Sequence, residues 1–160
     1  MAAGSTYTPI ATTTFSGGTT YTFSSIPSTY TDLVLVVAGS SAAVETMLLR
    51  FNGDTGTNYS WLRILGNGSS ASSSLQSNTS GAVGGFMDNG QYVDITNIMN
   101  YSNTTTYKTT ISKMNAPSSY VGAFTSMWRS TSAINSITIL GDSGGTFNNG
   151  KATLYGIASA

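Results

Sequence analysis

Ser143 lies in the pentapeptide GDSGG at 141–145, and it is the side chain that the sequence best suggests as a nucleophile. A serine hydroxyl attacks a substrate only when a neighbouring base takes its proton, and histidine normally supplies that base. The chain contains no histidine and no cysteine. Lys108 or Lys151 would have to act as the base, and nothing in the sequence marks either lysine as desolvated. We therefore expect a glycine-rich turn at 141–145 and no enzymatic activity.

In letters alone, this pentapeptide resembles the segment around the nucleophile of chymotrypsin-like serine proteases, whose mechanism requires the missing histidine. A second pattern, at 52–58, places oxygen-bearing side chains at alternate positions, as calcium-binding loops do. The twelfth position of such a loop would be Arg63, where an EF-hand has a bidentate glutamate. We therefore expect a connecting loop, and neither a metal ion nor another cofactor.

Aromatic side chains suggest a further kind of binding site, because flat rings stack on sugar rings. Tyr59, Trp61 and Trp128 are the candidates for glycan stacking. On alternating strands the same residues would lie in the core, so both interpretations stay open. No close pair of carboxylates indicates glycoside hydrolysis.

The composition limits the partners of the chain. Only 8% of the 160 residues are charged, and six basic residues balance six acidic ones. Nucleic-acid binding needs a basic stripe and membrane-surface binding a basic amphipathic helix, so we expect neither partner. A sparsely charged surface near zero net charge repels copies of itself weakly, which is acceptable in a permanent assembly. The first residues contain no basic start and no apolar run, so we expect no secretory signal.

Alternation of apolar and polar residues dominates the sequence and predicts an all-β fold. Segments such as 20–23, 92–96, 107–112, 135–139 and 154–157 alternate, and turn signals such as Asn-Gly separate them. We expect about eight to ten short strands in an antiparallel, jelly-roll-like β-sandwich. The segment 42–51 also fits a helix, although its neighbours favour a strand. Residues 66–85 are expected to form a long surface loop.

We divide the chain into a polar N-terminal arm at 1–14 and a single β-sandwich domain at 15–160. The strand expected at 33–38 is apolar on both faces. Its outer face, with Val34 and Val36, must be covered by a loop, by the arm or by a second subunit. We therefore expect Val34 and Val36, together with Tyr7, Pro9 and Ile10 of the arm, to make assembly contacts.

Several stretches together resemble a β-sandwich module of structural proteins from tailed bacteriophages, including phages of cyanobacteria. These stretches are TYTFSSIP (20–27), YTDLVL (30–35), LRFNGD (49–54), NYSW (58–61), YSNTTTYK (101–108), MWRS (127–130) and ATLYGI (152–157). The likeness extends over residues 19–158. It is a pattern of strand and turn residues, so it implies fold and setting rather than a catalytic residue.

The resemblance implies a virion protein that is assembled in the host cytoplasm. A capsid decoration (cement) protein would bind the major capsid protein as a homo-oligomer, plausibly a trimer, and stabilise the assembled head. The alternative is a receptor- or glycan-binding module of a tail fibre.

Overall fold

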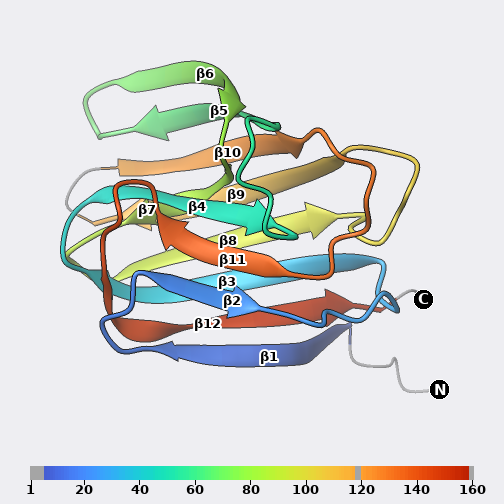
Figure 1. The fold of residues 1–160 in the computed structure, drawn as a ribbon. Helices are drawn as coiled ribbons and strands as arrows, with labels where there is room; N and C mark the ends of the chain where they lie inside the picture. The colour runs from blue at the N-terminus through green and yellow to red at the C-terminus, as the bar shows by residue number, and fades with distance from the viewer. Residues whose placement is uncertain (1–5, 118–119, 159–160) are drawn as a thin grey trace.

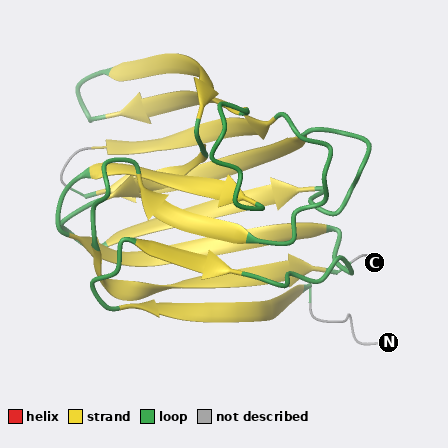
Figure 2. Ribbon diagram, viewed as in Figure 1, coloured by secondary structure: helices red, strands yellow, loops and turns green. Residues whose placement is uncertain are grey.

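The structure, a computed structural model, describes residues 6–117 and 120–158. In this part of the chain every regular element is a strand, and no helix is present (Figure 2). Twelve strands form two antiparallel sheets. The all-β antiparallel sandwich predicted from the alternation is therefore confirmed, with more strands than the eight to ten expected.

The large sheet has eight strands and forms the back of the molecule in Figure 1. Its order is β1-β12-β3-β8-β9-β10-β5-β6, so β1 and β6 are its two edges. The strands are β1 (Tyr7–Phe15), β12 (Phe147–Ile157), β3 (Asp32–Ser41), β8 (Tyr92–Met99), β9 (Lys108–Ala116), β10 (Tyr120–Trp128), β5 (Tyr59–Gly66) and β6 (Ala71–Thr79).

The small sheet has four strands and packs on one face of the large sheet (Figure 1). Its order is β2-β11-β4-β7, with β2 (Thr20–Phe23), β11 (Ile137–Gly141), β4 (Glu45–Phe51) and β7 (Ala82–Met87). The segment 42–51 thus contains a strand, as its neighbours favoured. The main core between the sheets is rich in aromatic side chains, among them Phe15, Phe51 and Phe147.

Strand β7 is buried along its whole length, and hydroxyl groups of the large sheet bind its backbone. The Ser126 hydroxyl accepts from the Val83 amide at 3.0 Å, and the Ser112 hydroxyl donates to the Val83 carbonyl at 2.9 Å. The Thr96 hydroxyl donates to the Gly84 carbonyl at 3.3 Å. Because β7 is the last strand of its sheet, these side chains replace the neighbouring strand that would otherwise satisfy its backbone.

The hydroxyls determine which way β8, β9 and β10 face. Thr96, Ser112 and Ser126 are buried, so the alternate residues of the same strands point away from the small sheet. Ile95 and Ile111 are therefore exposed. The alternation predicted β8 and β9, but it did not show that Ile95 and Ile111 face outward while Ile98 of β8 faces the core.

Two segments differ from the prediction. Residues 7–15 form the edge strand β1, which pairs with β12, where we expected a free polar arm at 1–14. Its threonines suit a strand with one solvated face, and residues 1–5 lie outside the described part of the chain. The expected loop at 66–85 contains β6 and β7. Both strands are rich in serine or glycine, so the sequence lacks the hydrophobic pattern that predicts a strand. Backbone pairing in β6 and close packing in β7 need few bulky side chains.

Asp94 is an acidic residue of β8 that lies buried against Gly85 of β7. Its side chain is buried, and neither carboxyl oxygen has a hydrogen-bond partner among the described residues. A Cβ atom on Gly85 would overlap this carboxyl group, so only glycine lets β7 approach so closely. Burial disfavours the charged form and raises the pKa of Asp94 well above its ordinary value.

We therefore expect the free energy of unfolding to fall as the pH rises above about 4, because the folded state keeps a proton on Asp94 that the unfolded chain releases near pH 3.9. Asp94→Asn should raise stability at pH 8 and flatten this slope, as measured by urea unfolding at several pH values. The control Asp142→Asn changes an exposed carboxyl group and should keep the slope. An unchanged slope in Asp94→Asn would show that Asp94 ionises normally in the folded protein.

Candidate functional site

The outer face of the large sheet, which the small sheet does not cover, carries most of the exposed apolar side chains. We call seven of them the apolar outer face: Leu62, Ile64, Leu75, Val93, Ile95, Ile111 and Val121. The register places them on one side of five neighbouring strands, β8, β9, β10, β5 and β6. Lys113 lies among them as the charged residue of β9 on this side.

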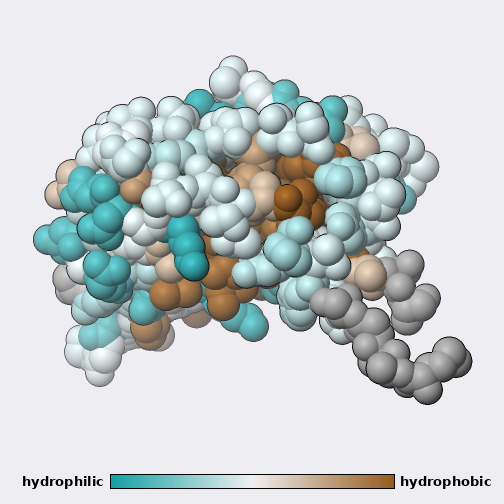
Figure 3. Space-filling model, turned by 90° about the horizontal axis from the view of Figure 1, so that it is seen from below, coloured by the Kyte–Doolittle hydropathy of each residue, from teal (hydrophilic) through white to brown (hydrophobic). Residues whose placement is uncertain are grey.

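The outer face is hollowed along β10, where small residues lie between larger ones. Gly122 and Ala123 line one hollow of about 430 Å³ together with Ile64 and Val121. A second hollow, of about 280 Å³, is lined by Leu62, Leu75 and neighbouring residues. Figure 3, which views the molecule from the β1 side, shows hydrophobic side chains gathered in patches on a mostly hydrophilic surface.

The five predicted assembly contacts have different surroundings. Tyr7 and Pro9 are exposed on β1, and the Tyr7 ring packs edge-on against Tyr155. Ile10 lies at the bulge of β1 and turns towards the core. Val36 is half-buried.

Val34 is only 4% exposed, which corrects its prediction as a contact. It lies opposite Tyr155 of β12 and Asn97 of β8, and both residues belong to its own sheet. The single chain thus buries Val34 without a second subunit.

Two of the three predicted glycan-stacking residues are in the core. Tyr59 and Trp128 stack with an interplanar angle of 16°, and both pack against Phe51. The Tyr59 hydroxyl accepts a hydrogen bond from the Phe51 amide, and burial raises the pKa of Tyr59 to about 12. Neither ring has a free face for a sugar, so this prediction was wrong for both residues.

Trp61 is half-buried and lines a hollow of about 200 Å³. Its ring packs edge-on against Phe124. The hollow lies between β4 and the β5–β6 hairpin, and Gln76, Asp142, Thr46 and Thr79 contribute polar groups to its lining. An aromatic ring beside amide, carboxyl and hydroxyl groups is an arrangement that suits a sugar ring.

Ser143 lies in a turn that is tied to Glu45. The Ser143 amide donates to Glu45 Oε2 at 2.7 Å, and a Cβ atom on Gly145 would overlap Oε1 of the same residue. The ammonium group of Lys108 donates to the backbone carbonyls of Thr106 and Thr131 instead. The predicted turn is confirmed: Gly141 and Gly145 leave room for the Glu45 carboxylate, and Gly144 has a φ of +81°, which favours glycine.

Asp54 holds the 52–58 loop together. Its carboxylate accepts hydrogen bonds from the Trp128 indole at 2.7 Å, the Gly56 amide at 2.8 Å and the Asn58 side chain at 3.0 Å. Burial alone would raise the pKa of Asp54, but these three hydrogen bonds outweigh it and leave the pKa below its ordinary value. Within residues 6–117 and 120–158, no group of three or more acidic side chains is arranged to hold a metal ion.

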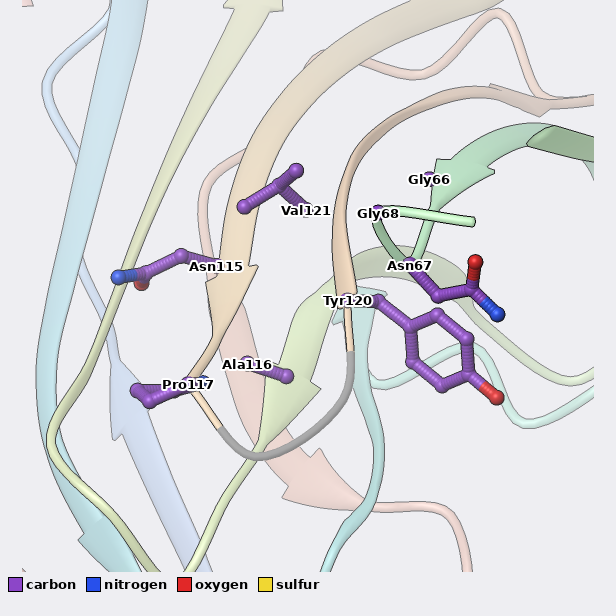
Figure 4. A pocket seen from close by; sticks show the side chains of 8 residues that line it. All are labelled: Gly66, Asn67, Gly68, Asn115, Ala116, Pro117, Tyr120 and Val121. Carbon is purple, nitrogen blue, oxygen red and sulfur yellow. The ribbon is translucent and has the colours of Figure 1, made fainter. Parts of the chain in front are cut away.

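A further hollow, of about 380 Å³, lies between the β5–β6 turn and the β9–β10 turn (Figure 4). Tyr120 and Asn67 line it, and no titratable side chain apart from Tyr120 does so among the described residues. The Asn115 side chain accepts a hydrogen bond from the Val93 amide at 2.6 Å, so it links β9 to β8. Among the described residues, the lining of this hollow contains no acidic or basic side chain.

Comparison of the chain with protein-family models, curated proteins and solved structures finds no match. The part of the chain that the structure describes has no helix long and apolar enough to cross a membrane. The apolar outer face was not recognised from the sequence. In the sequence, Val93, Ile95 and Ile111 alternate with polar residues. This alternation indicates strands but does not show which side of each strand is buried.

Asp54→Ala should lower the free energy of unfolding by roughly 1–3 kcal/mol, because it leaves the Trp128 indole and two further donors without their acceptor. Urea unfolding measures this effect, and Asp142→Ala, at an exposed carboxylate, is the control with little change. Added Ca²⁺ should leave the melting temperature of the unmodified protein unchanged. A calcium-dependent rise that Asp54→Ala abolishes would contradict the structural role and restore the metal-loop interpretation.

Proposed function

We propose that this chain is a non-enzymatic building block of a protein assembly, and that it binds its assembly through the apolar outer face. The observation that carries the proposal is the grouping of exposed Leu, Ile and Val side chains on one side of five strands. A monomer gains nothing from this arrangement, because each side chain stays in contact with water. Burying apolar surface contributes about 25 cal/mol per Å², so a partner on this face would gain a large favourable term.

The setting we propose is the particle of a tailed bacteriophage, with the chain as a capsid decoration protein on the major capsid protein. The support is the resemblance of residues 19–158 to structural modules of such phages. The low charge also supports a permanent assembly, because a chain with only 8% charged residues and no net charge repels other copies of itself weakly. A protein that binds the assembled shell and not the free coat subunits stabilises the shell by mass action.

Deleting residues 1–14 is not a clean test of attachment, because it removes most of β1 and exposes the edge of β12. A surface substitution on the outer face tests the proposal better. Ile95→Glu should weaken attachment to particles at least tenfold, because the new carboxylate would be desolvated in the contact. Val44→Glu, at an exposed apolar residue between β3 and β4, is the matched control.

Binding to particles that lack the chain is measured by co-sedimentation, and circular dichroism verifies that both variants fold. Quantitative mass spectrometry of native particles should find a copy number comparable to that of the coat protein. Attachment of Ile95→Glu at the unmodified level would contradict the role of the outer face. A few copies per particle would indicate a tail protein instead of a head protein. Absence of the chain from particles would reject the proposal that it is a virion protein.

The Trp61 hollow supports a second candidate function, the binding of a cell-surface glycan. Trp61→Ala should then abolish binding to host polysaccharide in a glycan array, whereas Trp128→Phe, in the core, should lower stability and keep the glycan site. No binding by the unmodified protein would reject this function.

A further inference from the structure

Strand β6 is an edge strand, and its residues 71–77 lack the usual protection. It ends the order of the large sheet, so only β5 pairs with it within the described residues. Residues 71–79 contain no charged residue and no proline, and most of their side chains are exposed. Proteins normally block such edges with charges, prolines or bulges, because an open row of amides and carbonyls pairs with another strand.

The other sheet edges in the described part of the chain are less available. Strand β1 carries Pro9 and a bulge between Pro9 and Ala11, and both features interrupt pairing. Strand β2 has four residues, and β7 is buried throughout. At the opposite end of the molecule from β1, β6 is the long, accessible edge (Figure 1).

We propose that two copies of the chain join through β6, in an antiparallel pair whose two-fold axis passes at Leu75. A bulge at Asn78, which has a φ of 59°, ends the regular part of the strand. The regular residues 73–77 are symmetric about Leu75. The pairing sets Leu75 against its own copy, Ser74 against Gln76 and Ser73 against Ser77, with no like charges opposed.

The side chains around the axis favour a second copy as the occupant. Leu75 is 66% exposed, and its neighbour in register is Leu62, which is 42% exposed. Paired strands place opposite residues on the same face, so Leu75 and Leu62 of both copies would form one apolar cluster. Ile64 of each copy flanks this cluster on the same face. Two large sheets would thus continue as one sheet, and the apolar outer face would extend across the junction.

The first test is the mass of the purified chain by light scattering after size exclusion. We expect a dimer, with twice the 16.6 kDa chain mass, and a shift to monomer in Leu75→Lys, which sets two ammonium groups against each other. Val44→Lys makes the same change at another exposed apolar residue and should stay dimeric. A monomeric unmodified protein, or a trimer that Leu75→Lys leaves intact, would overturn the proposal.

The second test measures the register and uses the absence of cysteine from the sequence. Ser73→Cys and Ser77→Cys place single thiols on the same face as Leu75. In the proposed register, residue 73 of each copy lies about 13 Å from its own equivalent, too far for a disulfide, and next to residue 77 of the other copy. Each variant alone should stay reduced under mild oxidation, whereas a mixture of the two should form the disulfide-linked heterodimer.

Equal cross-linking of each variant with itself would reject the register. These outcomes are independent of the proposed function, because they concern the isolated chain. A monomer that still binds particles through Ile95 would leave the assembly role standing and reject only the β6 dimer.

Discussion

The structure depends on the way β7 satisfies its buried backbone. The hydroxyls of Thr96, Ser112 and Ser126 bind the amide and carbonyl groups of Val83 and Gly84. Leaving a buried backbone group without a partner costs more free energy than a hydrogen bond contributes on balance. The backbone of β7 therefore needs these hydroxyls on the inner side of the large sheet. Since side chains alternate along a strand, turning these hydroxyls inward turns Ile95 and Ile111 beside them outward, although Ile98, Phe124 and Trp128 of the same strands stay in the core.

The apolar outer face follows from that constraint, and it is the feature that points to an assembly. The polar residues that suggested chemistry are used inside the chain instead. Asp54 anchors the Trp128 indole, Glu45 holds the turn at Ser143, and Lys108 donates to backbone carbonyls. These internal contacts, together with the apolar outer face, are the basis on which we propose that the chain binds other proteins.

The sequence predicted the fold class because alternation with β-branched residues is a property of the backbone period. It could not predict β6, whose serines carry no hydrophobic signal. It also could not predict which side of β8 is buried, because this depends on contacts with β7 of the other sheet. Aromatic residues suggested a sugar site, but the type of ring does not reveal burial. Packing placed Tyr59 and Trp128 in the core and left Trp61 at a hollow. Val34 shows the same limit, because its own sheet covers it.

Hydroxyl-radical footprinting of the chain, free and bound in particles, tests directly whether the apolar outer face is the contact surface. The oxidation rate of each exposed side chain reports its contact with solvent in both states. We predict strong protection of Ile95, Ile111 and Val121 in the particle, with little change at Val44, which lies in the loop between β3 and β4. Unchanged oxidation of the three outer-face residues in chains that are bound to the particle would contradict this prediction.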